Sequence, residues 1–325
     1  MSNNRLNIIS VSSERSEMSP SRLARKKELQ ARYDRLWLID PEQFNPLRNC
    51  MQKERLDRTW TLIEQYVDLN GKHVVDLGSG AGTFSRRMRD AGAMVEAVDI
   101  AHNALKHLLE FDSHHIHTRQ DAMPETGLPD ENYELVAAME LIAELPPDDY
   151  RLFFAELARI IKPDGYLVCS SPIDIYTEGG VEKLLNLAQT EFEIGAIKKS
   201  YHALHIRLKN FFEAPSKYVE AWKNPQTRRN ELEKRVGFDR YWFFLNSTIL
   251  FMWIWVALAP LMKPILTLLK DSRSLLLRLE SICEFISDDA GVSHLIFIAK
   301  RRPMHMEIEP ENLPLERPKK REVWE

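Results

Sequence analysis

The glycine-containing segment Val74–Phe84 constrains the fold of this chain more than any other stretch of its sequence. Its residues read Val-Val-Asp-Leu-Gly-Ser-Gly-Ala-Gly-Thr-Phe, an apolar run followed by three glycines in the pattern G-x-G-x-G. Glycines allow a tight turn and let a ligand approach where Cβ atoms would clash. The segment predicts a buried strand, a ligand-binding turn and a helix, with the ligand at the carboxyl edge of a parallel sheet.

The alternation of strand-like and helix-like segments continues beyond this turn. The repeated pattern of strand, loop and helix predicts strands over 73–77, 94–98, 116–119, 135–139, 166–170 and 294–299. The clearest helix between them covers 148–161. Strands that alternate with helices indicate a parallel sheet covered on both faces. We therefore predict an α/β protein with a doubly wound, Rossmann-like sheet.

Composition changes along the chain and suggests its organisation. Residues 175–240 are polar and helix-like without a strand signal, and 241–262 form an apolar segment. Ends rich in serine, or in proline and charge, are typical of disordered segments. The predicted order is a disordered arm (1–18), a helical cap (19–70), the core (71–174), a helical insert (175–280), the final strands of the core (281–301) and a disordered tail (302–325).

Composition also excludes several classes of protein. The 325 residues include 44 basic and 48 acidic side chains, a net charge of −4, so no global basic field favours nucleic acid. The three cysteines are odd in number and far apart, which predicts a reducing compartment and no metal site. The first 20 residues lack the apolar run of a signal peptide, so a cytoplasmic protein is expected.

Three aspartates near strand ends narrow the identity of the ligand. A dinucleotide site would carry G-x-G-x-x-G, but Thr83 stands where the third glycine of that pattern belongs. The carboxylate of Asp76 would be awkward beside a pyrophosphate but suits a cationic ligand. Asp99 ends the next strand, where it could accept from both hydroxyls of a ribose, and Asp121 follows the third strand. Taken alone, Asp99 could instead be a helix N-cap and Asp121 a turn residue.

These motifs resemble those of the class I S-adenosylmethionine-dependent methyltransferases, in particular those that act on quinones and small molecules. The resemblance covers about 55–172 and resumes at 294–300. The residues that carry it are Asp76-Leu77-Gly78-Ser79-Gly80-Ala81-Gly82, Asp99-Ile100, Asp121-Ala122 and Ile161-Lys162-Pro163-Asp164-Gly165-Tyr166-Leu167.

The resemblance implies S-adenosylmethionine as the cofactor and implies which residues would contact each part of it. Loop 78–82, with Gly78, Gly80 and Gly82, would pass under the methionine moiety. Asp99 would bind the ribose, and Ile100 would pack on the adenine. Asp121, followed by Ala122, would accept a hydrogen bond from the adenine amino group. Asp76 would help to hold the ammonium group, partly through water.

Methyl transfer demands little of catalytic side chains. The sulfur leaves as a neutral thioether, so the enzyme mainly aligns the reactants and needs a base only if the acceptor loses a proton. Related enzymes carry a glutamate and, three residues later, a histidine after the fourth strand. Here Glu140 is present but Ala143 replaces the histidine. The base lies elsewhere, the acceptor needs none, or activity is lost. Glu140 is favoured as a residue that positions the cofactor over a role as base.

Further catalytic candidates follow the fifth strand. They are Asp174, Tyr176, Tyr201, His202 and His205. The two histidines are three residues apart on an expected helix, so they could share one face. Solvated or core histidines are nevertheless the favoured interpretation of this pair.

The apolar segment 241–262 suggests contact with a membrane. Its 22 residues carry no charge, and about 20 apolar residues suffice to cross a bilayer. A single crossing conflicts with the fold, because the final strand must return to the same sheet. A helical hairpin that bends near Pro260–Pro264, or a helix in the interface, satisfies this constraint, and basic residues at 228–240 suit an anionic surface. The alternative is a soluble insert whose apolar face covers the active site or a dimer partner.

The leading hypothesis is transfer of a methyl group from S-adenosylmethionine to an apolar or amphiphilic acceptor that is lipid- or quinone-like. The enzyme would be cytoplasmic and held peripherally on a membrane through 241–280. Two alternatives stay open. One is a methyltransferase that acts on a soluble small molecule or protein with the insert as a lid, and the other is a catalytically silent scaffold that binds the cofactor.

Overall fold

The computed structural model describes residues 20–112, 115–173, 180–233, 235–287 and 291–303. The expected disordered arm (1–18), most of the expected tail (302–325) and the candidates Asp174 and Tyr176 lie outside the described residues.

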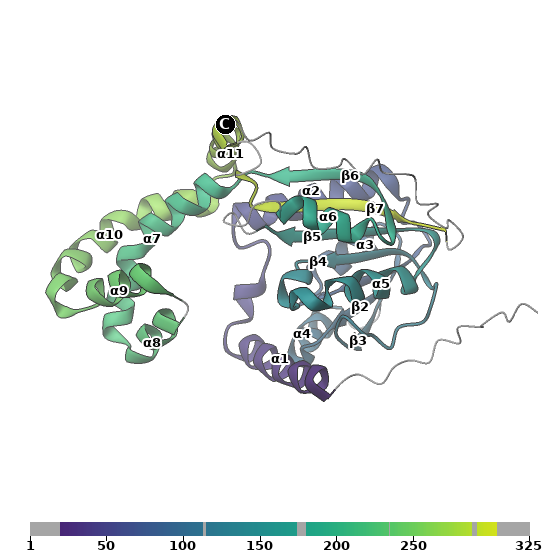
Figure 1. Ribbon diagram of the computed structural model, residues 1–325, viewed down its shortest axis with the longest axis horizontal. Helices are drawn as coiled ribbons and strands as arrows, with labels where there is room; N and C mark the ends of the chain where they lie inside the picture. The colour runs from purple at the N-terminus through teal and green to yellow at the C-terminus, as the bar shows by residue number, and fades with distance from the viewer. Residues whose placement is uncertain (1–19, 113–114, 174–179, 234, 288–290, 304–325) are drawn as a thin grey trace, which may run out of the picture.

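A single seven-stranded sheet forms the centre of the protein (Figure 1). Its strands are β1 (His73–Leu77), β2 (Met94–Asp99), β3 (Ile116–Gln120), β4 (Tyr133–Met139), β5 (Ile161–Pro172), β6 (Phe192–Ser200) and β7 (His294–Arg301). The spatial order is β3-β2-β1-β4-β5-β7-β6. Neighbours from β3 to β5 pair in parallel, and β7 pairs antiparallel with both β5 and β6. The predicted α/β, doubly wound, Rossmann-like fold is confirmed.

Helices bury both faces of the sheet, because successive strand residues point to opposite sides. On one face, Val75, Val136 and Leu167 pack against α5 (Tyr150–Ile160) and α6 (Gly180–Ala188). On the other, Val74, Val95 and Leu135 pack with α2 (Cys50–Tyr66), α3 (Thr83–Asp90) and α4 (His102–Phe111). Two short 3₁₀ helices, η2 (Ile142–Glu144) and η3 (Pro147–Asp149), link β4 to α5.

The N-terminal helices lie partly outside these layers. α1 (Pro20–Ile39) and the 3₁₀ helix η1 (Pro41–Phe44) cross the carboxyl edge of the parallel strands. Trp37 of α1 is buried and stacks on Phe44, with ring centroids 4.7 Å apart. α2 begins at an N-cap, Asn49, whose side-chain oxygen accepts from the backbone N–H of Gln52 (2.8 Å).

Strand β6 corrects the expectation for 175–240. That segment was expected to be helical throughout, but β6 lies within it and pairs with β7 from Phe192↔Arg301 to Ser200↔His294. β6 is an edge strand whose side chains alternate between half-buried and exposed, so it lacks the apolar run that marks a central strand. The insert therefore begins after β6. Of the described residues in the final segment 281–301, those of β7 form a strand and 281–287 belong to α11.

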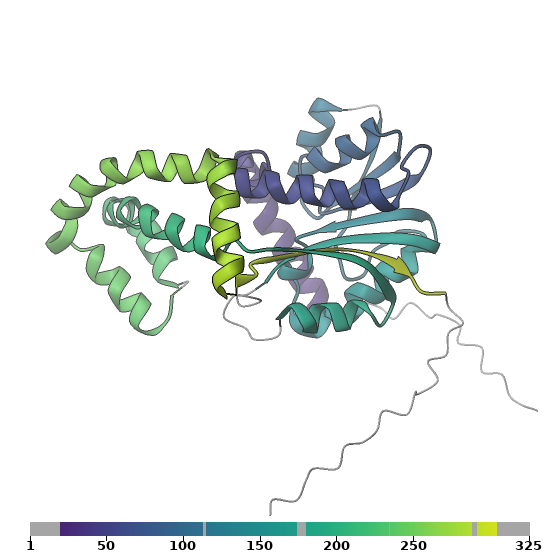
Figure 2. The ribbon, with the colours of Figure 1, turned by 90° about the horizontal axis from the view of Figure 1, so that it is seen from above.

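Five helices leave the sheet after β6 and return to it at β7. They are α7 (Ala203–Lys223), α8 (Pro225–Glu233), α9 (Gly237–Asn246), α10 (Ile249–Asp271) and α11 (Arg273–Ser287). α7 and α10 run side by side and project from the body as an arm (Figures 1 and 2). The hairpin bend expected near Pro260–Pro264 does not form there. α10 curves through both prolines, and the chain reverses instead at Ser247–Thr248.

A cluster of charged side chains, in which Glu54 and Glu280 are buried and Arg273 is exposed, fixes the base of the arm to the body. The guanidinium of Arg58 on α2 makes two bonds to the carboxylate of Glu280 on α11 (2.7 and 2.6 Å) and a third to Glu54 (3.1 Å). Arg273 donates to the other oxygen of Glu54 (2.7 Å). Burial alone would raise the pKa of Glu280, but hydrogen bonds from His202 and Arg58 lower it to about 2. These pairs join α2 to the returning helix of the insert.

Removing Arg58 tests this junction. Arg58→Ala leaves the buried carboxylate of Glu280 without a guanidinium and leaves Glu54 with that of Arg273 alone, so the free energy of unfolding should fall by about 3–5 kcal/mol. Urea denaturation followed by circular dichroism measures the loss. Arg229→Ala removes an exposed ion pair with Glu233 (3.0 Å) and should cost less than about 1 kcal/mol. Equal losses in the two variants would contradict a stabilising role for the Arg58 cluster.

Candidate functional site

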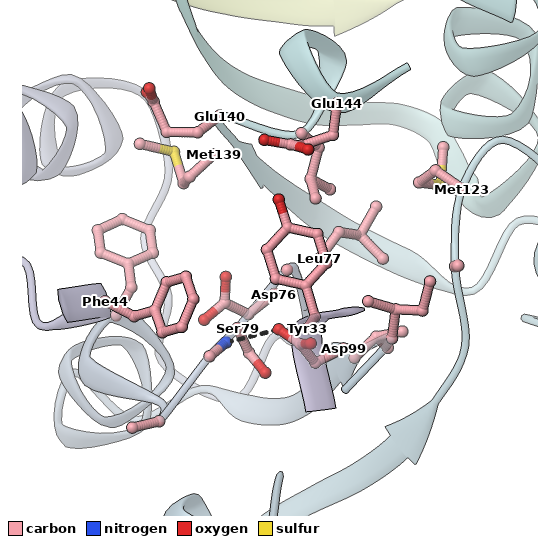
Figure 3. Close-up of a pocket in the computed structure, with 18 of the residues that line it drawn as sticks. Tyr33, Phe44, Asp76, Leu77, Ser79, Asp99, Met123, Met139, Glu140 and Glu144 are labelled. Atoms are coloured by element: carbon pink, nitrogen blue, oxygen red, sulfur yellow. Dashed lines mark hydrogen bonds between the residues drawn. The ribbon is translucent and has the colours of Figure 1, made fainter. Parts of the chain in front are cut away.

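A cavity of about 1130 Å³ opens at the carboxyl edge of β1, β2 and β4 (Figure 3). The glycine loop forms its floor, and α1 and η1 form the opposite wall with Tyr33, Trp37 and Phe44. The cavity brings together nearly all the residues predicted from the sequence: Asp76, Gly78, Gly80, Asp99, Ile100, Asp121, Ala122 and Glu140. Of the predicted cofactor residues, Gly82 does not line the cavity and is the N-cap residue of α3.

The glycine loop needs glycine for both conformation and space. Gly78, Gly80 and Gly82 have φ values of 72°, 54° and 75°, in the left-handed region that other residues rarely adopt. A Cβ on Gly82 would lie 2.5 Å from Leu108 Cδ1, and one on Gly80 would lie 3.1 Å from Trp37 Cζ2. The backbone N–H of Gly78 donates to the carbonyl of Val98 (2.8 Å), which ties the loop to β2.

Asp99 fastens the loop from the neighbouring strand. One carboxylate oxygen accepts from the N–H of Gly80 (2.9 Å), and the other accepts from the N–H of Ala101 (2.8 Å). The helix that follows has Ala101 as its N-cap residue, without a side-chain cap bond, so Asp99 is not an N-cap. Burial raises the pKa of Asp99. This side chain therefore shapes the loop and also lines the cavity.

Asp76 lies deep under the loop, with 2% of its surface exposed. The hydroxyl of Ser85 donates to one carboxylate oxygen (2.5 Å). Burial raises the pKa of Asp76 to about 7, and the nearby charge of Asp99 adds to the shift. A cation placed beside this carboxyl would stabilise its ionised form.

Asp121 is both a turn residue and a residue of the cavity lining. Its oxygens accept from the backbone N–H groups of Ala122 (2.8 Å) and Gly127 (2.7 Å), as in a turn, yet the side chain also lines the cavity. Lys26 of α1 pairs with it at 2.7 Å. Burial favours a higher pKa, but the N–H of Gly127, Lys26 and the N–H of Ala122 together hold the pKa below its ordinary value.

Glu140 is held by three residues that the sequence analysis did not connect with it. Its Oε2 accepts from Arg55 Nη1 (3.0 Å), and its Oε1 accepts from the hydroxyl of Ser170 (2.6 Å) and from His294 Nε2 (2.5 Å). Its φ of 63° is unusual for a residue other than glycine. The carboxylate points away from Asp76 and Asp99 in Figure 3. Burial acts to raise the pKa of Glu140, but these partners bring it below its ordinary value.

The other predicted candidates lie away from the cavity wall. His202 and His205 are buried at the base of the arm, and His205 Nε2 lies 2.8 Å from the carbonyl oxygen of Leu269. The interpretation as core histidines is the one that fits. Tyr201 is not part of the wall either. Across the described ranges, no group of three or more His, Cys, Asp or Glu side chains is arranged to hold a metal ion.

Comparison with known proteins agrees with this geometry. Residues 75–169, which extend from within β1 to within β5 and include the glycine loop, match the family model described as a methyltransferase domain. The chain carries a class I S-adenosylmethionine-dependent methyltransferase domain.

The methyltransferase domain has curated relatives in bacteria. A ubiquinone biosynthesis O-methyltransferase from Aromatoleum aromaticum is 31% identical over 160 residues, which are 47% of this chain and 62% of the relative. The protein of the same name from Paracidovorax citrulli is 27% identical over 199 residues, which are 59% and 76% of the two chains. The match to the Aromatoleum protein thus spans less than two thirds of its length.

Solved structures also resemble the methyltransferase domain. An S-adenosylmethionine-dependent methyltransferase from Mesorhizobium loti aligns with a TM-score of 0.44 and 14% identity, over 76% of this chain and all of that one. The N-methyltransferase NodS from Bradyrhizobium japonicum, in complex with S-adenosyl-L-homocysteine, aligns with a TM-score of 0.44 and 15% identity, over 54% and 89% of the chains.

S-adenosylmethionine is the cofactor of this domain, and the cavity fits it. The hydroxyl of Ser79 is buried on the cavity floor without a hydrogen-bond partner among the described residues. A buried polar group of this kind needs a partner, which a bound polar ligand would supply. The loop glycines leave room for close approach, and the buried carboxyl of Asp76 suits a cation. These features match a ligand with an amino acid part and a nucleoside part.

Proposed function

We propose that this protein transfers a methyl group from S-adenosylmethionine to an apolar or amphiphilic acceptor at a membrane surface. The observation that carries the proposal is the placement of the insert. The arm projects from the end of β6 that adjoins the start of β7, on the same side of the sheet as the cofactor cavity (Figure 1). A membrane in contact with the arm would therefore face the side that holds the cavity.

The residues predicted for the cofactor keep those roles in the proposal. The glycine loop and the hydroxyl of Ser79 hold the methionine part, and Asp76 attracts its ammonium group. Asp99 accepts from the ribose with the lone pairs that its backbone donors leave free. Ile100 and Ala122 pack on the adenine, and Asp121 accepts from the adenine amino group. Lys26 keeps Asp121 ionised and orients it.

The bound cofactor supplies a methyl group on a positively charged sulfur, which leaves as a neutral thioether. The chain has to orient the acceptor and exclude water. Glu140 is the charged group best placed to meet the acceptor, since it lines the cavity beyond the cofactor loop. The lining of the same cavity also includes apolar side chains: Phe44, Leu56, Met139, Leu145 and Pro146. An apolar acceptor with one polar reactive group suits this wall.

The names of the relatives support a quinone-like acceptor that is methylated on oxygen. The substrate remains a proposal for this chain, because the aligned part covers only 62% of the Aromatoleum protein. The insert also favours an apolar acceptor over a soluble one. Among the described residues, all that line the cavity precede Tyr150, so the described helices of the arm contribute nothing to its wall.

The surface of the arm supports contact with lipid. Of the described helices, α10 is the one long and apolar enough to cross a membrane, and only 6% of its most apolar stretch is buried. Trp253 is 81% exposed, Leu250 is 72% exposed and Phe238 on the neighbouring α9 is 76% exposed. Apolar surface of this extent marks an interaction site. Arg228, Arg229 and Arg240 precede it and suit anionic headgroups.

The uncharged part of α10 is shorter than the hydrocarbon core of a bilayer. The uncharged part of α10, from Ile249 to Met262, spans about 21 Å at about 1.5 Å per residue, whereas the hydrocarbon core is about 30 Å thick. Lys263 ends this part. α7 and α10 run side by side, so both ends of the arm lie at the body of the protein. This geometry supports peripheral attachment.

Asp99→Ala should weaken binding of S-adenosylmethionine by about 10-fold or more, because it removes the ribose acceptor and the anchor of the loop. Isothermal titration calorimetry measures the affinity. Asp57→Ala is the control, since Asp57 pairs with Arg87 (2.9 Å) outside the cavity wall. Unchanged affinity in Asp99→Ala would refute the assigned role.

Flotation with phosphatidylcholine vesicles that contain phosphatidylglycerol tests the membrane contact. The wild-type protein should float with the vesicles at low salt. The double variant Leu250→Glu/Trp253→Glu should have a vesicle partition coefficient lower by about 10-fold or more. Both side chains are exposed, so the variant should fold. Leu38→Glu replaces an equally exposed apolar residue of α1 and should float as the wild type does. A wild-type protein that stays at the bottom would sink the proposal of membrane contact.

Label transfer tests the activity itself. The protein is incubated with methyl-labelled S-adenosylmethionine and a lysate of the cells from which it comes, and the products are partitioned. We expect label in the organic phase, since the acceptor wall is apolar. Label in the protein or small-molecule fraction would instead support the soluble-acceptor alternative. Binding of the cofactor without label transfer to any fraction would contradict the proposed activity and support the catalytically silent scaffold.

A further inference from the structure

Four polar side chains from distant parts of the chain meet at the end of β4. Arg55 comes from α2, Glu140 follows β4, Ser170 lies on β5 and His294 begins β7. Arg55 Nη1 also lies 3.5 Å from each ring nitrogen of His294. The backbone N–H of Glu140 donates to the carbonyl of Ser170 (2.9 Å), which holds the positive φ of Glu140. Such backbone conformations persist where the surroundings impose them, and they gather at functional sites.

The two carboxylate oxygens of Glu140 accept different numbers of hydrogen bonds. Oε1 accepts two bonds, from Ser170 and His294, and each oxygen of an ionised carboxylate has about two lone-pair sites. Oε2 accepts one bond, from Arg55. Glu140 and Arg55 line the cavity, whereas His294 is buried behind them, with 4% of its surface exposed. One acceptor position of Oε2 is therefore left for a group inside the cavity.

We propose that Glu140 accepts the proton of the methyl acceptor through Oε2, and that His294 and Arg55 are positioning residues for this carboxylate. The inference rests on the proposed function. An acceptor hydroxyl loses its proton to Oε2 while its oxygen forms a bond to the methyl carbon. The carbon–sulfur bond breaks and its electron pair stays on sulfur, so charge balances with a neutral ether, a neutral thioether and a protonated Glu140.

His294 acts as a neutral hydrogen-bond donor in this arrangement. Burial lowers the pKa of His294, and the charges of Arg55 and His202 act in the same direction, whereas Glu140 opposes them. A neutral ring bonded to Oε1 carries its proton on Nε2. The histidine that family resemblance places after Glu140 is absent at Ala143, and His294 supplies an imidazole to the same glutamate from the other end of the chain.

Kinetics of His294 variants test the inference. His294→Ala should lower kcat by about 10-fold or more, with little change in cofactor affinity, because Glu140 loses a donor but the cofactor loses no contact. His294→Gln should recover most of the rate, since its amide N–H can still donate to Oε1. His117→Ala is the control, because His117 lies exposed on β3, outside the cavity. An unchanged kcat in His294→Ala overturns the inference. Equal losses in both His294 variants, accompanied by weaker cofactor binding, would make His294 a packing residue and also overturn it.

Imidazole ¹⁵N NMR gives a readout that does not depend on turnover. The wild-type spectrum should show His294 with its proton on Nε2 at pH 7, and Glu140→Gln should lower the pKa of His294 further because it removes the neighbouring negative charge. The same His294 titration in both proteins would overturn the pairing. Failure of the wild type to transfer methyl groups would overturn the proposed function and this inference together. Transfer by a wild type whose His294→Ala variant is unaffected would overturn the inference alone.

Discussion

The antiparallel pairing of β7 between β5 and β6 decides the arrangement of the whole molecule. β7 must enter the sheet at the edge where β6 leaves it, so the helices between them have both ends at that edge. This is also the carboxyl edge of the parallel strands, where the cofactor cavity lies. The same pairing brings His294, the first residue of β7, beside the end of β4. Insert, cavity and polar cluster are thus neighbours because of one strand.

Helix α2 connects these parts through adjacent residues. Arg55 contacts Glu140 at the cavity, while Glu54 and Arg58 bind Arg273 and Glu280 at the base of the arm. Buried ion pairs of this kind add little net stability compared with apolar packing, but breaking one partner is costly. They favour one orientation of the arm on the body. The position of the arm and the position of the Glu140 carboxylate therefore depend on one rigid helix.

The sequence was sufficient for the parts of this structure that depend on local pattern. The strands β1 to β5 and β7, the glycine loop and the gathering of Asp76, Asp99 and Asp121 follow from the repeated order of strand, loop and helix and from the geometry of a parallel sheet. β6 was missed because a half-exposed edge strand has no apolar run. His294 and Arg55 were missed because they are 154 and 85 residues from Glu140, and only the folded sheet brings them together. Lys26 had a local signal, since Arg22, Arg25 and Lys26 share one face of α1.

The length of the arm has a consequence for how an acceptor could reach the cavity. α7 alone has 21 residues, which is about 32 Å of helix at about 1.5 Å per residue. If the arm contacted a bilayer, its tilt would set the distance between the catalytic body and the headgroups. Upright, it would hold the cavity beyond the reach of an acceptor still seated in lipid. Exposed apolar residues continue along α10 as far as Leu261, Ile265 and Leu268, so the apolar surface runs along the arm as well as at its tip. In the proposed membrane-bound state, an arm that lies along the bilayer would expose less of this apolar surface to water, and the cavity would then lie closer to the lipid.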